Sequence, residues 1–229
     1  MISVLQQPDC GTNTARRARS TQQPVDGHPR PLRGTLGPLR GTLVTETFVP
    51  EVNGVAMTLS RLMSGMRERG HQMDIVRPRM PRDYPDGCDV AVPLPTINRP
   101  GLAIPNYPLM RIGMPSLTTL RATWRRQPPD VVHIATEGPM GLSALIAARS
   151  LGIPCTSSFH TNFDQYTAHY HFGFLRPTVA GYLRWVHNRS ACTMVPTLSQ
   201  ARSLQAEGYR RVRILSRGLD ERLFHPDRR

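Results

Sequence analysis

The sequence predicts an α/β protein with an open, Rossmann-like parallel sheet and helices on both of its faces. From Leu43 onwards, short apolar runs of strand length alternate with longer segments whose apolar residues recur at helical spacing. This alternation is the pattern of a parallel sheet covered on both sides. With 229 residues, the chain is long enough for one such domain and too short for two.

The predicted elements follow in the order that such a sheet requires. A short first strand at 43–45 leads into a helix whose apolar residues from Val55 to Met66 share one face. Gly70 and Gly152 close two of the helices, because glycine readily takes the left-handed backbone conformation of a helix end. Further strands are expected at 73–76, 90–92, 131–134, 153–159, 192–195 and 212–215, and further helices at 140–151, 174–187 and 199–207. The proline-rich stretch 93–115 is expected to be a long loop, a kind of segment that is often functional.

The N-terminal segment differs in composition from the rest. Residues 1–41 are rich in Pro, Gly, Thr, Gln and Arg and show no periodicity, so they cannot bury enough apolar surface to fold. We expect a disordered extension, in preference to an organelle transit peptide, and a Rossmann-like domain at 42–215.

The charge favours anionic partners. The net charge is +13 and is carried by arginine alone, since the chain contains no lysine. Phosphates, nucleic acid and acidic membrane surfaces are the partners that such a balance attracts. Nucleic acid is not expected, because the arginines are scattered and no recognition motif occurs. The absence of G-x-G-x-x-G argues against a dinucleotide-binding oxidoreductase.

Cysteine spacing and hydropathy indicate the compartment. The four cysteines, Cys10, Cys88, Cys155 and Cys192, form no C-x-x-C pair, which favours free thiols over disulfides or a metal site. No apolar run approaches the roughly 20 residues of a membrane-spanning helix, and no secretory signal opens the chain. We expect a cytoplasmic protein, at most peripheral at the inner face of the plasma membrane.

Polar residues follow the predicted strands, where ligands bind to open α/β sheets. Asn53 and Gly54 open the first helix, either as an anion site at its N-terminus or as a plain cap with Asn53 at the N-cap. Glu137 follows the strand 131–134 and could bind a sugar hydroxyl, act as a base or complement the helix dipole. His133, inside that strand, is interpreted as structural.

The loop after the strand 153–159 is the most informative stretch. It begins with His160, which alone would more often be structural than functional. A cluster of hydroxyl, amide and carboxylate groups follows within six positions: Thr161, Asn162, Asp164 and Tyr166. This company makes His160 a candidate for the site.

Four ordered blocks carry a resemblance to a known family. They are 43–55, 129–139, 157–166 and 216–220, and they resemble the N-terminal half of the GT-B fold in retaining glycosyltransferases of family 4. The resemblance spans roughly residues 43–227 and is nearest to bacterial GDP-mannose-dependent α-mannosyltransferases that act on lipid acceptors. It implies a two-lobed hexosyltransferase in which this lobe binds a lipid or glycan acceptor and the second lobe binds the nucleotide-sugar.

The resemblance also implies roles for individual residues. Asn53, Gly54, Arg217 and Gly218 would lie at the donor diphosphate, and His160 would be catalytic, near the transferred sugar. Glu137, Thr161, Asn162, Asp164 and Tyr166 would contact the acceptor or the sugar. Residues 216–229 would begin the linker to the second lobe, and neither a divalent metal nor a cofactor is expected.

The chain departs from the family pattern in two ways. The glutamate pair, eight positions apart, and the lysine of the family's donor lobe do not occur, so we expect this polypeptide alone to have no detectable transferase activity. In addition, Pro38, Arg40 and Gly41 replace the apolar residues expected before Leu43, which leaves the order of the opening strand open.

A competing interpretation is a basic module without catalysis that binds a membrane surface or nucleic acid. Leu117, Leu120 and Trp124 fall on one helical face beside Arg121, Arg125 and Arg126, a composition suited to an anionic lipid interface. An ordinary surface helix packed by its apolar stripe explains the same pattern and is preferred.

Overall fold

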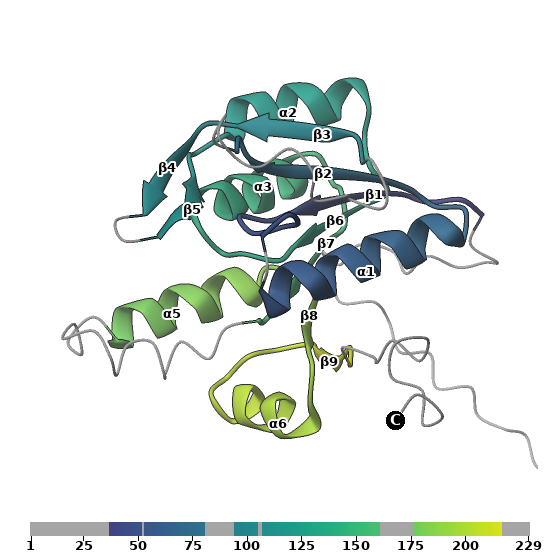
Figure 1. Cartoon of the computed structure of the whole chain (residues 1–229). Helices are drawn as coiled ribbons and strands as arrows, with labels where there is room; N and C mark the ends of the chain where they lie inside the picture. The colour runs from purple at the N-terminus through teal and green to yellow at the C-terminus, as the bar shows by residue number, and fades with distance from the viewer. Residues whose placement is uncertain (1–36, 52, 81–93, 105–106, 161–175, 217–229) are drawn as a thin grey trace, which may run out of the picture.

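A seven-stranded parallel sheet in the order β3-β2-β1-β6-β7-β8-β9 forms the centre of the structure (Figure 1). The computed structural model describes residues 37–51, 53–80, 94–104, 107–160 and 176–216. The sheet strands are β1 (Arg40–Val44), β2 (Gln72–Pro78), β3 (Thr96–Arg99), β6 (Val131–Ile134), β7 (Cys155–Ser158), β8 (Cys192–Val195) and β9 (Val212–Ile214). The predicted fold class is confirmed.

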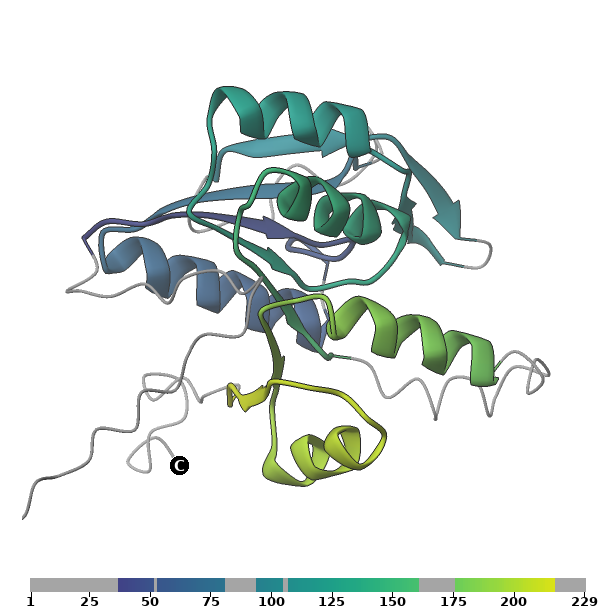
Figure 2. The ribbon, with the colours of Figure 1, turned by 180° about the vertical axis from the view of Figure 1, so that it is seen from behind.

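Helices lie on both faces of this sheet (Figures 1 and 2). They are α1 (Gly54–Glu68), α2 (Leu117–Arg126), α3 (Pro139–Ser150), α5 (Arg176–His187) and α6 (Leu198–Ala206). Strand order runs outward from β1 in both directions, and crossovers between parallel strands are right-handed. Helix α1 therefore covers one face, and α3 covers the other.

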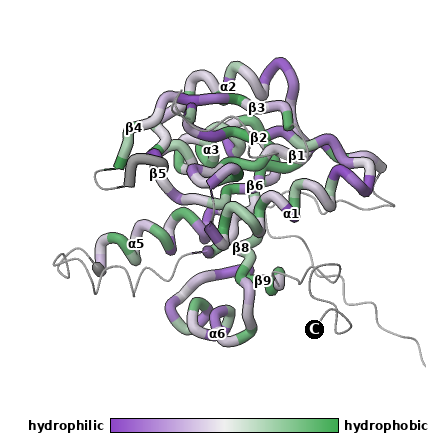
Figure 3. Tube along the Cα trace, viewed as in Figure 1, coloured by the Kyte–Doolittle hydropathy of each residue, from purple (hydrophilic) through white to green (hydrophobic). Residues whose placement is uncertain are grey.

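The two faces of the central strands contribute to two different apolar cores. Leu43 and Ile75 pack against Leu59 and Met63 of α1. Their chain neighbours Val44 and Val76, together with Ile134 of β6, pack on the opposite side with residues of α2, α3 and α5. Because successive strand residues point to opposite faces, one short strand supplies both cores. Apolar residues accordingly line the central strands, while α1 alternates in hydropathy (Figure 3).

Several predicted boundaries are confirmed. Strands β6 and β8 span the predicted residues, and Gly70 and Gly152 have the positive φ angles of helix ends, 85° and 69°. The strand predicted at 90–92 lies outside the described residues.

Strand β1 is central and begins at Arg40, two residues inside the segment assigned to the extension. The polar Arg40 and the small Gly41, which made this part of the strand hard to predict, have specific partners in the tertiary structure. Arg40 forms an ion pair of 2.9 Å with Asp74, and a Cβ atom on Gly41 would lie 2.7 Å from the Met73 side chain. Contacts with the neighbouring strand β2 thus stabilise the start of β1, where the sequence lacks the apolar residues of a typical central strand.

The prediction of a loop at 93–115 was wrong. This stretch contains the edge strand β3 and a two-stranded antiparallel ribbon of β4 (Gly101–Ile104) and β5 (Tyr107–Gly113). Pro95 and Pro100 flank β3 instead of interrupting it, and Pro108 has no register partner in β4 because the ribbon is irregular there. Proline is tolerated at such positions because its missing N–H removes no ladder hydrogen bond there.

The apolar stripe of α2 faces the core. Leu120 and Trp124 are buried with the residues of α3, and the partly buried Leu117 packs against the same cluster. The stripe is therefore unavailable as a lipid-facing surface, and the preferred reading of a packed surface helix is confirmed. Across the described ranges, no helix combines the length and apolar character needed to cross a bilayer.

Candidate active site

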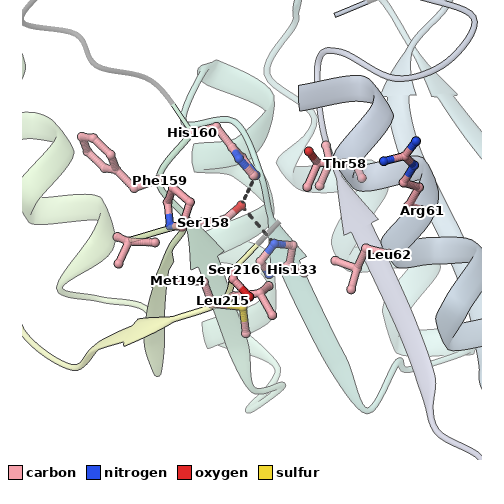
Figure 4. Close-up of a pocket in the computed structure, with 13 residues that line it drawn as sticks. Thr58, Arg61, Leu62, His133, Ser158, Phe159, His160, Met194, Leu215 and Ser216 are labelled. Atoms are coloured by element: carbon pink, nitrogen blue, oxygen red, sulfur yellow. Dashed lines mark hydrogen bonds between the residues drawn. The ribbon is translucent and has the colours of Figure 1, made fainter. Parts of the chain in front are cut away.

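A pocket of about 220 Å³ lies between α1 and the carboxyl ends of β6 to β9 (Figure 4). Helix α1 contributes Thr58, Leu59, Arg61 and Leu62, and the strands and the loops that follow them contribute His133, Ser158, Phe159, His160, Met194, Val195, Pro196, Leu215 and Ser216. The pocket occupies the place where open parallel sheets bind ligands. His160 lines it as predicted, and the other loop residues proposed to act with it, Thr161, Asn162, Asp164 and Tyr166, lie outside the described residues, as do Arg217 and Gly218.

His160 is linked to the strands by a row of hydrogen bonds. His160 Nε2 lies 2.6 Å from Ser158 Oγ, and Ser158 Oγ lies 3.1 Å from His133 Nε2. The other ring nitrogen of His133 lies 2.9 Å from Thr156 Oγ1. The parallel register of β6 and β7 pairs His133 with Thr156, which puts these side chains and that of Ser158 on one face of the sheet.

His133 is neutral near pH 7. Burial at the floor of the pocket and, as a smaller cause, the charge of nearby His160 lower the pKa of His133 to about 4. The interpretation of His133 as structural therefore needs an addition, because its side chain contacts the hydroxyl that binds His160.

The turn before α1 is built as a helix cap. Asn53 Oδ1 accepts hydrogen bonds from the backbone N–H groups of Val55 and Ala56, at 3.1 and 2.8 Å. The structure therefore shows the capping role that the sequence left open. Gly54 is exposed beside this cap, and Thr58, one turn later, donates to the Gly54 carbonyl and lines the pocket with His160.

A buried carboxylate holds this turn in place. Glu51 Oε2 accepts from the Thr47 hydroxyl at 2.5 Å, and Asn53 Nδ2 donates to the same hydroxyl at 2.7 Å. Arg77 lies 3.9 Å from Glu51 and donates to the Val49 carbonyl. Burial raises the pKa of Glu51, and the bond from Thr47 and the charge of Arg77 oppose that rise. The start of α1 is thus fixed by side chains of its own loop and by Arg77 of β2.

Glu137 points away from the pocket. Its Oε1 lies 2.9 Å from Nε2 of the buried His187, and its side chain is 10% exposed. Its backbone carbonyl accepts from the Tyr182 hydroxyl at 2.6 Å, so α5 engages Glu137 twice. Among the described residues, the lining of this pocket includes His160 and four α1 residues between Thr58 and Leu62, and it includes none of Asn53, Gly54 and Glu137.

Sequence reasoning missed two groups of residues. The first is the α1 side of the pocket, above all Thr58, Arg61 and Leu62, whose helical spacing could have indicated a second useful face beside the core stripe. The second is Glu46, which accepts from the Gly113 N–H at 3.0 Å. Its only sequence signal is its place directly after the first strand.

The match to a family model decides the classification. The model described as Glycosyltransferase Family 4 matches residues 52–223. The chain belongs to glycosyltransferase family 4. The family predicted from the four sequence blocks is therefore confirmed, and the chain is a glycosyltransferase by family.

Curated relatives agree with this family 4 assignment, and a solved structure agrees with the fold. A GDP-mannose-dependent α-mannosyltransferase of Mycobacterium tuberculosis is 31% identical over 191 residues, which cover 82% of this chain and 49% of that protein. An α-monoglucosyldiacylglycerol synthase of Streptococcus pneumoniae is 26% identical over 144 residues, or 62% of this chain and 31% of that protein. Sucrose-phosphate synthase of Thermosynechococcus elongatus superimposes with a TM-score of 0.57 at 14% identity, covering 82% of this chain and 50% of that one, and shows the GT-B-type fold alone.

This family 4 chain spans about half the length of the curated mannosyltransferases it matches, namely 49, 45 and 50% of them.

Proposed function

We propose that this chain is the acceptor-binding lobe of a retaining glycosyltransferase that transfers mannose from GDP-mannose to a lipid or glycan acceptor. The observation that carries the proposal is the pocket in which His160 faces helix α1, one turn from the Asn53–Gly54 turn (Figure 4). The names of the relatives support the donor and the lipid class of acceptor.

The chemistry of this lobe would be electrostatic. A departing nucleoside diphosphate gains negative charge in the transition state, and fixed donors aimed at that charge lower the barrier. The exposed backbone at Gly54 lies at the positive end of the α1 dipole, although Asn53 already satisfies the next two amides. His160 would add a hydrogen bond to the transferred sugar or its leaving group. The proposal requires no divalent metal.

The remaining donor-binding groups would come from a second lobe. The glutamate pair and the lysine expected for that lobe do not occur in these 229 residues. We therefore propose that the polypeptide binds acceptor but does not transfer sugar by itself. Sugar transfer by the purified chain would overturn this part of the proposal.

The test measures sugar transfer in a protein that carries both lobes. Turnover with GDP-mannose, UDP-glucose and UDP-N-acetylglucosamine is compared, using a membrane lipid extract as acceptor. Transfer from GDP-mannose should dominate, and His160→Ala should lower turnover about 100-fold, the usual cost of one such donor.

A matched histidine controls for nonspecific effects. His71 lies just before β2, at the opposite ends of the strands, where its Nδ1 accepts from the Leu39 N–H. His71→Ala should leave turnover near the unchanged value. Transfer from UDP-sugars alone would refute the proposed donor, and near-normal turnover of His160→Ala would remove His160 from the mechanism.

A further inference from the structure

We propose that Thr156, His133 and Ser158 are positioning residues that fix the tautomer of His160 and hold its proton at Nδ1. The inference deepens the proposed function and rests on it, since it concerns the histidine assigned there to the transferred sugar or its leaving group.

The four side chains form a single row from the sheet to the pocket. The three contacts are Thr156 Oγ1 to His133 Nδ1 at 2.9 Å, His133 Nε2 to Ser158 Oγ at 3.1 Å and Ser158 Oγ to His160 Nε2 at 2.6 Å. Figure 4 shows the last two as dashed lines. Each distance is that of a good hydrogen bond, so each link needs one donor and one acceptor.

Counting protons gives the row a direction. Within the part of the chain that the structure describes, the Thr156 hydroxyl has its one hydrogen bond with His133. If His133 Nδ1 carried the proton, the proton of the Thr156 hydroxyl would lack a protein acceptor. Since His133 is the one hydrogen-bond partner that the described residues give this partly exposed hydroxyl, we infer that Thr156 donates to His133 Nδ1.

The remaining links follow from this first one. Neutral imidazole has one N–H and one lone pair, so His133 carries its proton at Nε2 and donates to Ser158 Oγ. The Ser158 hydroxyl is then left to donate to His160 Nε2. As an acceptor, His160 Nε2 has no proton, and the neutral ring carries its proton at Nδ1.

This order requires a neutral His133. A doubly protonated ring would donate at both nitrogens and reverse the bond to Thr156. Burial in the pocket floor is the main reason that the pKa of His133 is about 4, which keeps the ring neutral at physiological pH.

The functional consequence concerns which ring nitrogen of His160 carries the proton. In water, histidine prefers to carry its proton at Nε2, whereas the row imposes the opposite tautomer through the bond at the other nitrogen. The neutral ring thus carries its N–H group at Nδ1. A donor of this kind suits a sugar hydroxyl or a developing oxyanion.

The test is ¹⁵N NMR of the histidine side chains in the 229-residue chain at mildly alkaline pH. The chain contains eight histidines, and spectra of His160→Gln and His133→Gln identify the two signals of interest. We expect His160 to show a protonated, pyrrole-like Nδ1 and an unprotonated, pyridine-like Nε2 in most molecules.

Thr156 provides the matched variants, because it does not line the pocket. Thr156→Val keeps the shape but removes the hydroxyl, and the majority of His160 should then shift to the Nε2–H tautomer. Thr156→Ser keeps the hydroxyl and should leave the spectrum unchanged. Should Thr156→Val lose its dispersed spectrum, Ser158→Ala breaks the last link and should cause the same loss of the Nδ1–H form.

Two outcomes would overturn the inference. One is a wild-type His160 that carries its proton mainly at Nε2. The other is an unchanged His160 tautomer in a folded Thr156→Val or Ser158→Ala variant. Because the measurement involves no sugar transfer, its failure and a failure of the proposed function can be told apart.

Discussion

Glu46 makes the stability of this domain depend on pH near neutrality. Its carboxylate follows β1 and accepts from the Gly113 N–H at 3.0 Å, which ties β5 to the central sheet. A Cβ atom on Gly138 would collide with this carboxylate, so the group is closely packed. Burial, with a smaller contribution from the charge of Glu137, raises the pKa of Glu46 from 4.5 to about 7, although the bond from Gly113 opposes the rise.

The direction of the effect follows from proton binding. Between pH 4.5 and about 7 the folded chain holds a proton on Glu46 that the unfolded chain has lost. The free energy of unfolding therefore falls as pH rises through this window, and the loss is complete above it. At about 1.4 kcal/mol for each pH unit, the loss approaches about 3 kcal/mol.

Glu46→Gln tests this reasoning directly. The amide cannot ionise, and its carbonyl oxygen can still accept from Gly113. Urea unfolding followed by tryptophan fluorescence should give similar free energies for both proteins at about pH 4.5, and a variant more stable by up to about 3 kcal/mol at about pH 8. Glu68→Gln, at an exposed position at the end of α1, should change stability by less than about 1 kcal/mol. Parallel curves for the wild type and Glu46→Gln across this pH range would refute the account.

Three further pairs of variants test the packing of the helices, each by urea unfolding. Asn53→Ala removes the side-chain cap of α1 and should cost about 1 kcal/mol, while Asn53→Asp should retain most of the stability; equal losses would contradict the capping role. Gly141→Ala should destabilise strongly, since its Cβ would collide with the backbone before α3, whereas Gly181→Ala meets open space in α5 and should stabilise by up to about 1 kcal/mol. Replacing the buried Leu145 by Ala should lower the free energy of unfolding by about 2–5 kcal/mol, whereas replacing its 41%-exposed neighbour Ile146 by Ala should lower it by less than about 1 kcal/mol. Similar losses for the two variants would contradict the orientation of α3.

Local patterns predicted most of the regular structure. The limits of β6 and β8 and the glycine ends of α1 and α3 were found because periodicity and helix termination depend on neighbouring residues. The stretch from β3 to β5 was missed for the opposite reason. Its prolines read as breaks in the sequence, and only the edge positions of these strands in the assembled sheets make them acceptable.

The pocket was predicted in part. The rule that ligands bind at the carboxyl ends of parallel strands predicted the position of His160 at the pocket, and the Asn53–Gly54 turn lies one helical turn before the lining residue Thr58. The same rule suggested Glu137, but the carboxylate turns to His187, about fifty positions further along the chain. A strand-end rule predicts where the backbone of a residue lies and does not predict which way its side chain points.

The sequence by itself determined the α/β class, the family and the strand end at which His160 lies, because these depend on patterns carried by contiguous residues. Only the tertiary structure decided that His133 and Ser158 meet His160, that Asn53 caps α1 and that Glu137 is withdrawn from the pocket. These contacts depend on the register of β6 against β7 and on helices that pack from distant parts of the chain. Side-chain hydrogen bonds extend only about 3 Å, so a shift of one residue in that register would turn His133 to the other face and break the row.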